Sequence, residues 1–388
     1  MATALEEQIR VEFEKEQARS EPVRTLDELP RSYDDISDTW WTAAMCRDVP
    51  GAQVIAHRLD DADDGSNNRR RVFLEYNAPG EAARLPPSVF CKATHGLANR
   101  LMLGHTHGVV SEGTFYKLVR PQLTFETPAC YFANFSEQTY NSIVVLEDIA
   151  PRGRFCRWDD YIDLDRVKAK IDILVDLHSR YYDAPVLSST LTAFPTWHQR
   201  FNSFLKFHLE ESCTTGFLAS EDVVPTRLYA RSAEVWPATV AAVEAHKDLP
   251  LALCHGDTHL KNWYFTDDGG SGLADWGSIV RGHWSRDLAY MMSTCLTVED
   301  RRSWQDDLIR YYVDGMAARG IDLGTAEQVQ AWFRQSLLAS LAWWTLCVQP
   351  AGGDFPFLHE PNSVRCFVGR MATAIDDNDA LDACLVVA

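Results

Sequence analysis

Three side chains that carry oxygen atoms follow one another at short spacing in the second half of the chain. The segment Cys-His-Gly-Asp-Thr-His-Leu-Lys-Asn holds Asp257 and Asn262, and the nearby Leu-Ala-Asp-Trp-Gly-Ser holds Asp275. A carboxylate can orient a reacting hydroxyl, and carboxylate and amide oxygens are hard ligands of the kind that Mg²⁺ prefers. The spacing therefore indicates phosphoryl transfer from a magnesium-bound nucleotide, with Asp257 at the hydroxyl and Asn262 and Asp275 at the metal.

The sequence around these residues predicts a turn, a short strand, a hairpin and a returning strand. Asp-Asp-Gly-Gly at 267–270 lies between the apolar stretches Trp-Tyr-Phe and Gly-Leu-Ala. Glycine favours the left-handed backbone of tight turns, so this stretch predicts a hairpin. We expect the first strand to offer Asn262 and the second to deliver Asp275. His255 is expected to stay neutral and to brace the turn that holds Asp257.

A lysine in an apolar strand and a glutamate in a helix form a second pair of candidate residues. Lys92 interrupts Ser-Val-Phe-Cys-Lys-Ala-Thr, where a buried ammonium is costly unless it is paired. Glu112 follows on the first turn of a helix predicted over 110–119. A strand lysine held by a helix glutamate is the device with which protein kinases bind nucleotide phosphates. The alternative is an exposed lysine on an edge strand and a solvated glutamate.

These motifs together resemble the aminoglycoside phosphotransferase and choline kinase superfamily. The resemblance rests on His255-Gly256-Asp257, on Asn262 five positions beyond the aspartate, and on Asp275 in Asp-Trp-Gly. The neighbouring sequence, including Glu-x-x-Phe-Tyr after the strand lysine, resembles its ecdysteroid-kinase-like (CHK kinase-like) branch. The resemblance implies an α+β, two-lobed protein-kinase-like fold, with a small β-rich N-lobe and a larger, mainly helical C-lobe. It also implies ATP or GTP as the phosphate donor and Mg²⁺ as the metal.

Further nucleotide contacts follow from the same resemblance. Leu-Glu-Asp-Ile ends a predicted strand and resembles the family's hinge, so the carbonyl of Glu147 and the N–H of Ile149 are candidates for the adenine. Gly65, Ser66 and Asn67 lie in the loop of a predicted hairpin, where small residues would let backbone N–H groups approach phosphate oxygens. The chain has no G-x-G-x-x-G motif and no Walker loop, and four aspartates precede this loop. A solvated turn is therefore the alternative.

One further aspartate and three histidines are expected to have structural roles. The resemblance implies that Asp287 braces the catalytic loop from below. His178 ends a predicted helix and is expected to be packed rather than catalytic. His105 and His107 are spaced like metal ligands, but no third ligand with suitable spacing is apparent. We expect both to lie in a solvated polar connector that follows the strand of Lys92.

The chain divides into three predicted segments. Residues 1–50 form an N-terminal helical extension, 51–149 the kinase-like N-lobe, and 150–388 the C-lobe with the catalytic loop and the substrate pocket. Asp38 is expected to cap a short helix in the extension. A loop is expected at 352–356, followed by a final helix and a frayed acidic tail. Helical periodicity predicts the helices 164–182, 197–211, 221–230, 233–246, 304–319, 326–348 and 362–375.

The composition restricts the class of partner. The 388 residues carry 55 acidic and 37 basic side chains, a formal net charge of -18, which repels phosphate backbones and argues against nucleic acid. No apolar run reaches the length of a membrane span, and the N-terminal residues show no signal sequence. The ten cysteines form no C-x-x-C pair, which suits reduced thiols. We expect a cytoplasmic monomer or weak homodimer that acts on a small molecule and binds neither nucleic acid nor a membrane.

The predicted function is the ATP-dependent transfer of the γ-phosphate to a hydroxyl of a small molecule. The branch resemblance suggests a bulky apolar or polycyclic alcohol, such as an ecdysteroid or steroid, and the many aromatic residues at 194–217 agree with this. An aminoglycoside- or choline-type phosphotransferase is the alternative enzyme, because the acidic balance would suit a cationic acceptor. A kinase-like protein that binds nucleotide without turnover is the non-catalytic alternative. A metal-dependent hydrolase built on His255, Asp257 and His259 lacks a further ligand cluster.

Overall fold

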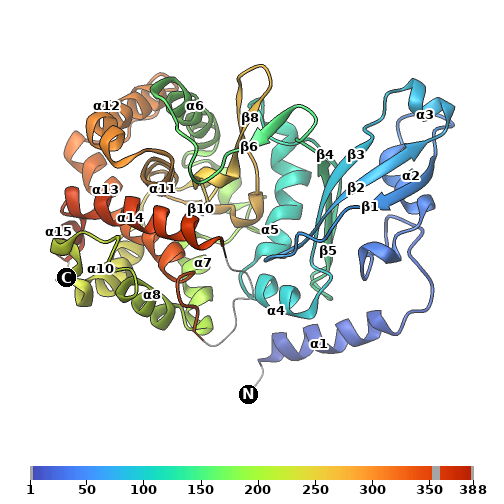
Figure 1. The fold of residues 1–388 in the computed structure, drawn as a ribbon, viewed down its shortest axis with the longest axis horizontal. Coiled ribbons are helices and arrows are strands. Elements are labelled where there is room, and N and C mark those ends of the chain that lie inside the picture. Colours follow the sequence, from blue (N-terminus) through green and yellow to red (C-terminus); the bar gives the residue numbers. More distant parts are fainter. Residues whose placement is uncertain (1–2, 352–358, 386–388) are drawn as a thin grey trace. The chain divides into compact units, whose positions relative to one another are not determined.

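The computed structural model describes residues 3–351 and 359–385, so the predicted loop at 352–356 lies outside the described residues. The chain forms two compact units (Figure 1). The first comprises Met1–Leu123 and Thr127–Arg152, and the second comprises Thr124–Glu126 and Gly153–Ala388. Within the described residues, no helix is long and apolar enough to cross a membrane.

The first unit is built on a five-stranded sheet in which every neighbouring pair is antiparallel. Val72, Leu74, Val89 and Cys91 of its strands are buried and pack with Trp40 in one hydrophobic core. Burial alternates over 72–76, whereas five of the six residues of 88–93 and of 142–147 are buried, as in strands that are covered on both faces. The strands, in the spatial order β1-β2-β3-β5-β4, are β1 Val54–Leu59, β2 Asn68–Tyr76, β3 Ser88–Ala93, β5 Ser142–Glu147 and β4 Cys130–Phe135.

The helices of the first unit differ from expectation at two places. The expected polar connector after Lys92 is largely helical, because Met102 and Leu103 turn an apolar face into the unit. The cap of the short helix is Ser37 rather than Asp38, since the Ser37 side chain accepts a hydrogen bond from the Trp40 amide. The helices are α1 Ala4–Gln17, α2 Asp38–Met45, α3 Ala78–Ala82, α4 Leu97–His105 and α5 Gly108–Thr114, the last continued by a π-helical turn over Phe115–Val119.

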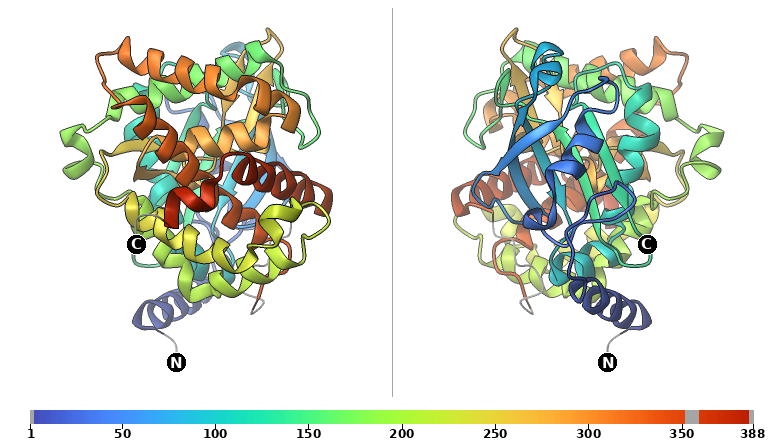
Figure 2. Two further views of the ribbon diagram at one scale, coloured as in Figure 1. Left: turned by 90° about the vertical axis from the view of Figure 1, so that its left-hand side faces the viewer. Right: turned by 90° about the vertical axis from the view of Figure 1, so that its right-hand side faces the viewer.

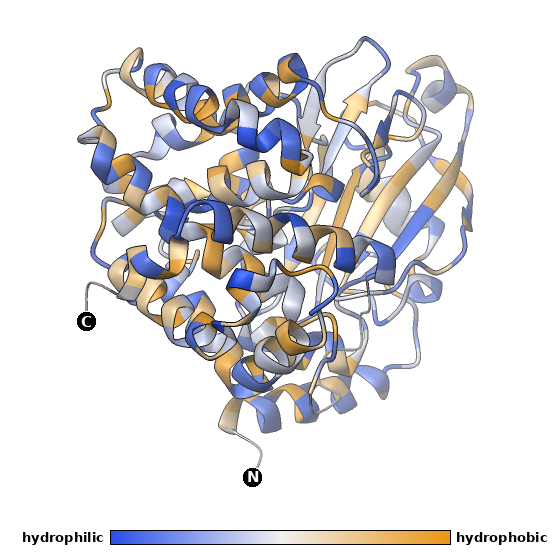
Figure 3. Cartoon of the chain, turned by 60° about the vertical axis from the view of Figure 1, so that its left-hand side comes forward, coloured by the Kyte–Doolittle hydropathy of each residue, from blue (hydrophilic) through white to orange (hydrophobic). Residues whose placement is uncertain are grey.

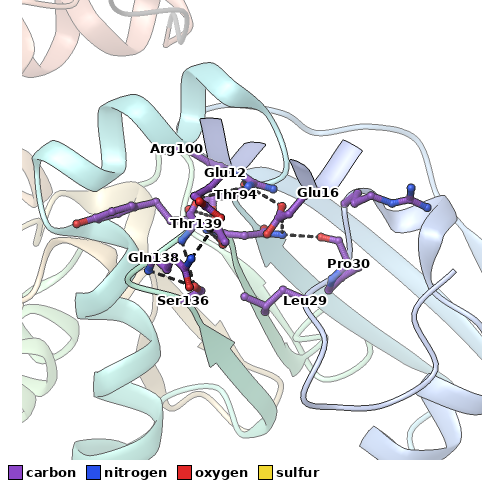
Figure 4. Close-up of polar contacts among 12 residues, drawn as sticks. Glu12, Glu16, Leu29, Pro30, Thr94, Arg100, Ser136, Gln138 and Thr139 are labelled. Carbon is purple, nitrogen blue, oxygen red and sulfur yellow. Dashed lines mark hydrogen bonds and ion pairs between the residues drawn. The ribbon is translucent and has the colours of Figure 1, made fainter. Parts of the chain in front are cut away.

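Among the contacts that join the N-terminal helix α1 to this unit are those of a buried arginine, Arg100 (Figure 4). The Arg100 side chain is fully buried and pairs with Glu16 of α1 at 2.6 Å. It also donates to the carbonyl oxygens of Thr94 and Thr139, at 2.9 and 3.3 Å. Thr94 follows directly on β3, so the contacts of α1 reach the end of the strand that carries Lys92.

The second unit is mainly helical. Helix α13 lies in its centre, with Phe333, Leu337, Leu338 and Leu341 buried, and packs against α8, α10, α11, α14 and α15. Figure 2 shows these helices side by side, and Figure 3 shows hydrophobic and hydrophilic residues alternating along them. The helices are α6 Leu164–Tyr181, α7 Trp197–Phe204, α8 Leu209–Leu218, α9 Thr226–Tyr229, α10 Ser232–Ala245, α11 Ser285–Cys295, α12 Val298–Ala317, α13 Ala326–Thr345, α14 Pro361–Asp377 and α15 Ala380–Leu385.

Three predictions for the second unit were wrong. The helix expected over 197–211 is two helices, because His208 adopts a left-handed backbone with φ 55° that a helix cannot continue through. Only Thr226–Tyr229 of the helix expected over 221–230 is α-helical. The expected frayed tail contains helix α15, where Leu381 and Cys384 are buried.

An antiparallel sheet dominates one unit and helices dominate the other, which confirms the predicted α+β class and the kinase-like arrangement. The sequence did not reveal three short strands of the second unit. Strand β6 pairs with β8, and β7 pairs with β10, so these strands flank the candidate catalytic segment. Their bounds are β6 Gly153–Phe155, β7 Ala252–Cys254 and β10 Val280–Gly282.

Candidate active site

The predicted hairpin is present and holds Asn262 and Asp275 at the same end. Strands β8 Trp263–Thr266 and β9 Ser271–Leu273 are antiparallel, and the turn between them contains Gly269 with φ 90°. The amide of Ala274 donates to the carbonyl oxygen of Asn262 at 2.9 Å, so the residues that flank the hairpin are paired as well. Asn262 ends a short 3₁₀ turn rather than lying in the strand.

Asp275 has a left-handed backbone, with φ 65° and ψ 68°. Aspartate tolerates this conformation better than most residues with a side chain, but it is still strained and must be held in place. The next residue, Trp276, supplies an anchor, because it is fully buried and its ring lies 4.6 Å from that of His255. The backbone at Asp275 is thereby anchored next to the segment that carries Asp257.

A glycine sets the turn that presents Asp257. Gly256 has φ 82°, and a Cβ atom at this position would lie 2.2 Å from the carbonyl oxygen of Ser278. Only glycine fits both the backbone conformation and this close approach. The side-chain nitrogen of Asn262 donates to the Asp257 carbonyl at 2.7 Å and lies 3.3 Å from its Oδ2. The nitrogen of the Asn262 amide is thus committed to Asp257, which leaves its oxygen as the atom that could bind a cation.

His255 makes a hydrogen bond through each of its two ring nitrogens to the backbone around the turn. Its Nδ1 accepts a hydrogen bond from the Asp257 amide at 3.2 Å, so its Nε2 carries the proton and donates to the Ala274 carbonyl at 2.9 Å. Burial lowers the pKa of this imidazole, which is therefore neutral at pH 7. Both ring nitrogens are used within the protein, which agrees with the predicted bracing role.

Asp287 binds the backbone of the catalytic turn. Its Oδ2 accepts from the His255 amide at 2.6 Å, and its Oδ1 accepts from the Gly256 amide at 2.9 Å. His178 lies 3.2 Å from Oδ2 and is itself bonded to the hydroxyl of Tyr312 at 2.8 Å. Burial opposes ionisation of Asp287, but the interactions with His178, with His255 and with the Gly256 amide together outweigh it and lower the pKa of the carboxyl.

This buried network also contains a potential metal-ligand group. The ligand atoms of His178, Cys254 and Asp287 lie within 4.8 Å of one another. Both oxygens of Asp287 already accept backbone N–H groups, and His178 is bonded on both ring nitrogens. The three residues therefore support the turn rather than form an open cation site.

The electrostatics of Asp257 suit a carboxylate that meets a hydroxyl. Burial opposes its ionisation, but the neighbouring histidines, His259 first among them, together outweigh burial and hold the pKa of Asp257 below its ordinary value. The side chain keeps 30% of its surface exposed, so it can still be reached. Asp257 is accordingly ionised at pH 7 and able to accept a proton or a hydrogen bond.

The first unit brings Lys92 and Glu112 together as predicted. The Lys92 ammonium lies 2.7 Å from Oε1 of Glu112, and both side chains are more than nine-tenths buried. Lys92 is not on an edge strand, since β3 pairs with β2 on one side and with β5 on the other. This excludes the alternative of an exposed edge lysine.

The loop with Gly65, Ser66 and Asn67 is held by contacts within the first unit. The side chain of Asn99 donates to the carbonyls of Gly65 and Ser66, at 2.9 and 2.8 Å. The Gly65 amide donates to the carbonyl of Asn67 at 2.9 Å, so this N–H group is used inside the turn. The neighbouring Asp63 and Asp64 are paired with Arg69 and Arg70, which offsets much of their negative charge.

The predicted hinge residues lie at the end of β5. The Glu147 carboxylate is bonded to the Arg152 guanidinium at 2.8 Å and accepts from the Ala129 amide at 3.2 Å. Ile149 is buried, and its carbonyl accepts from the Arg152 amide at 3.0 Å. These contacts keep the segment after β5 in one conformation.

Sequence reasoning missed two buried arginines beside the catalytic turn. Arg286 donates to the Gly256 carbonyl at 2.7 Å, and its guanidinium lies over the Trp197 ring at 3.4 Å. Arg200 lies 3.4 Å from the hydroxyl of Ser278, the residue that Gly256 approaches. Arg286 directly precedes Asp287, which was the one signal that could have drawn attention to it.

One family model matches a segment of the second unit. Residues 157–321 match the phosphotransferase enzyme family (APH), a range that includes Asp257, Asn262 and Asp275. No curated protein matches the chain.

Solved structures resemble the chain over most of its length at low identity. An ethanolamine kinase of Plasmodium vivax is 11% identical, with 84% of this chain and 83% of that chain covered and a TM-score of 0.44. A putative aminoglycoside phosphotransferase of Ralstonia eutropha is 13% identical, with 88% and 96% covered and a TM-score of 0.49. A macrolide 2'-phosphotransferase of Brachybacterium faecium is 11% identical, with 83% and 94% covered and a TM-score of 0.47.

Proposed function

We propose that this chain, which carries the phosphotransferase family segment over 157–321, is a kinase that phosphorylates a hydroxyl of a small molecule. One observation carries the proposal most directly. A single turn and hairpin hold Asp257, Asn262 and Asp275 together, with Asn262 bonded both to Asp257 and to the residue before Asp275. This is the set of groups that phosphoryl transfer requires.

Asn262 and Asp275 are proposed to hold Mg²⁺. The fit rests on their chemistry, because the free oxygen of the Asn262 amide and the Asp275 carboxylate are hard donors at one end of the hairpin. Magnesium bound there would neutralise charge on the nucleotide phosphates. A site with two protein ligands leaves the remaining positions to water and phosphate, as is usual for this ion.

Asp257 is proposed to receive the acceptor hydroxyl. Its lowered pKa keeps the carboxylate ionised, so it orients the hydroxyl and takes up the proton as the new oxygen–phosphorus bond forms. The bond between the γ-phosphorus and the bridging oxygen breaks at the same centre, and the nucleoside diphosphate leaves. The rate gain then comes mainly from positioning and charge stabilisation.

The first unit is proposed to bind the nucleotide, ATP or GTP. Lys92 would contact the phosphates, and Glu112 would hold its ammonium in place. The Glu147 carbonyl and the Ile149 N–H would meet the adenine edge, and the loop of Gly65, Ser66 and Asn67 would lie near the phosphates. Of these loop residues, Ser66 and Asn67 remain the stronger candidates for N–H donation, because the Gly65 amide is used within the turn.

The acceptor is proposed to be a bulky apolar or polycyclic alcohol, of the ecdysteroid or steroid kind. The second unit is rich in aromatic side chains that contact one another, among them Phe201, Phe204, Trp236 and Trp343. Stacked and edge-on rings of this kind supply large apolar surfaces. The ten free cysteines and the net charge of -18 agree with a cytoplasmic monomer or weak homodimer that does not bind nucleic acid.

A screen of hydroxylated molecules tests the proposed function. The purified chain is incubated with ATP and Mg²⁺ and with 20-hydroxyecdysone, kanamycin or choline, and each acceptor is examined by mass spectrometry. We expect one alcohol to gain the mass of a single phosphate, and only when both ATP and Mg²⁺ are present. Kanamycin or choline as the sole acceptor would replace the proposed polycyclic class. If neither ATP nor GTP raised the melting temperature of the chain, the result would contradict a kinase altogether.

A further inference from the structure

The second histidine of the catalytic segment, His259, has no role in the function proposed so far. It is buried, with 7% of its side chain exposed, although the segment around it is a loop. Its ring packs edge-on against Trp344 at 5.2 Å and lies 6.1 Å from the ring of Tyr290. The ring is thus clamped between the catalytic loop and helices α11 and α13.

The backbone sets the tautomer of this ring. The amide of Lys261 donates to Nδ1 of His259 at 3.2 Å, so Nδ1 is an acceptor and cannot carry the proton of a neutral imidazole. The proton of the neutral ring is therefore on Nε2. The same arrangement occurs four residues earlier, where the Asp257 amide donates to Nδ1 of His255.

The two histidines differ in what their Nε2–H groups meet. The Nε2 of His255 donates to the carbonyl of Ala274, next to Asp275. The Nε2 of His259 points to Oδ2 of Asp257 across 3.6 Å. This distance is longer than a full hydrogen bond, but contacts in catalytic sites without substrate are often long and tighten when the reacting complex forms.

A second donor approaches the same carboxylate from helix α11. The Tyr290 hydroxyl oxygen accepts from Nε1 of Trp344 at 2.7 Å, which leaves the hydroxyl hydrogen free to be donated elsewhere. The Asp257 carboxylate interacts with this hydroxyl and contributes to the raised pKa of Tyr290, for which burial is the main cause. The Nε2–H of His259 and the hydroxyl of Tyr290 therefore both lie on the side of Asp257 that faces helices α11 and α13.

On the basis of the proposed kinase function, we infer that His259 is a positioning residue for Asp257. Its Nε2–H holds Oδ2 of the carboxylate, so that the other oxygen, Oδ1, is directed to the acceptor hydroxyl. The proton of the hydroxyl passes to Asp257 rather than to the ring. Without this contact Oδ2 is held less firmly, since Asn262, whose side-chain nitrogen lies 3.3 Å from it, must orient the carboxylate with one donor fewer, and fewer bound acceptors are aligned for attack.

Two substitutions separate this role from support of the loop. His259→Asn places a carbonyl oxygen where Nδ1 stood, so it can still accept from the Lys261 amide, but it cannot reach Asp257. His259→Gln places an amide nitrogen near the position of Nε2, so it can still donate to Asp257, but it loses the contact with Lys261. We expect His259→Asn to lower kcat by about 10- to 100-fold, the usual range for a hydrogen bond to a charged group.

The same kinetic assay gives the KM for ATP of both variants and the kcat of His259→Gln. We expect the KM for ATP to stay within about threefold in both variants, and His259→Gln to retain kcat within about fivefold of the wild type. ADP release is followed with ATP, Mg²⁺ and the best acceptor of the alcohol screen, and with water as the acceptor where no alcohol reacts. An unchanged kcat in His259→Asn, or a greater loss in His259→Gln than in His259→Asn, would overturn the inference.

A second readout does not depend on turnover. Long-range ¹H–¹⁵N spectra of the wild type at pH 8 distinguish the two neutral tautomers of a histidine, with His259→Asn used to assign the signal. We expect the Nε2–H form, and the Nδ1–H form would overturn the inference. A wild type that releases no ADP but shows the Nε2–H form would place the failure in the proposed function, on which the inference rests.

Discussion

The two candidate groups of catalytic residues are built in opposite ways. In the first unit, Lys92 and Glu112 form one buried ion pair between a central strand and a helix. In the second unit, both aspartates lie on turns with positive φ. Asp257 follows Gly256, which has positive φ, and Asp275 has positive φ itself. A buried pair needs only two residues on rigid elements, whereas a strained turn must be held by many contacts from the surrounding helices.

The difference is clearest in the supporting residues. The turn at Gly256 is bound by Asp287 and Arg286 of α11, and behind Asp287 stand His178 of α6 and Tyr312 of α12. We therefore expect activity to depend on backbone geometry in the second unit and on the charge of Lys92 in the first unit. Each prediction below tests one side of that contrast.

The largest effect is expected from Gly256→Ala. Its new Cβ would lie 2.2 Å from the Ser278 carbonyl oxygen and would force the turn with Asp257 to move. We expect kcat to fall by at least about 100-fold, since small displacements of catalytic groups have effects of this size. Gly269→Ala is the matched control, because Gly269 also has positive φ but its Cβ would meet no atom within 4 Å. It should retain turnover and lose only about 1 kcal/mol of the free energy of unfolding.

The next effect is expected from Lys92→Met. The substitution removes the phosphate contact and breaks the buried ion pair between Lys92 and Glu112, so both kcat/KM for ATP and stability should fall, the latter by about 3 kcal/mol. The double variant Lys92→Met with Glu112→Leu should recover the free energy of unfolding but not the activity. Recovery of turnover in the double variant would show that the pair serves the fold alone.

A smaller effect is expected from Glu16→Gln in α1. The change leaves the buried guanidinium of Arg100 without its carboxylate, which should lower the free energy of unfolding by about 3 kcal/mol. Glu21→Gln is the control, because Glu21 is exposed and lies 3.9 Å from an exposed Arg24. Chemical denaturation of the two variants measures the difference, and equal stabilities would mean that the Glu16–Arg100 pair does not stabilise the first unit.

The smallest effect per residue is expected from acidification. Burial lowers the pKa of His246 to about 4 and that of His283 well below its ordinary value, and the two rings lie 5.5 Å apart in the second unit. The unfolded chain therefore takes up protons first, so stability is complete above about pH 6.5 and is lost as the pH falls below it. Each histidine should contribute a loss of about 2 kcal/mol at pH 5. Urea denaturation of the wild type and of His246→Gln at pH 7.5 and pH 5 measures the loss of the free energy of unfolding. The loss should be smaller in His246→Gln, and equal losses in the two proteins would contradict the prediction.

The same contrast explains what the sequence could predict. Lys92 stood out because an apolar strand rarely tolerates an unpaired lysine, and the hairpin stood out because Asp-Asp-Gly-Gly interrupts two apolar stretches. Both signals are local. Asp257, Asn262 and Asp275 were identified by type and spacing, and their adjacency follows from the short hairpin between them.

The missed features depend on contacts between distant segments. Arg286 and Arg200 approach the catalytic turn from α11 and α7, and no local pattern marks a buried arginine beside a turn. The break at His208 could not be read from the helical periodicity, because the spacing of apolar residues carries no signal for a left-handed backbone at a single residue. Helix α4 was missed because Gly96 and Gly104 resembled a connector, although Gly104 lies where α4 packs closely on Ile9 of α1 and a Cβ would be 3.1 Å from that side chain.

The most direct test of the account is a single-turnover assay of Asp257→Asn beside Asp267→Asn. Both variants lose one carboxylate, but Asp267 lies exposed at the tip of the hairpin, away from the residues proposed to act. With ATP, Mg²⁺ and the alcohol found in the screen, Asp267→Asn should phosphorylate the alcohol at the wild-type rate. Asp257→Asn should be slower by at least about 100-fold while keeping its melting temperature. Wild-type phosphorylation by Asp257→Asn would contradict the central claim.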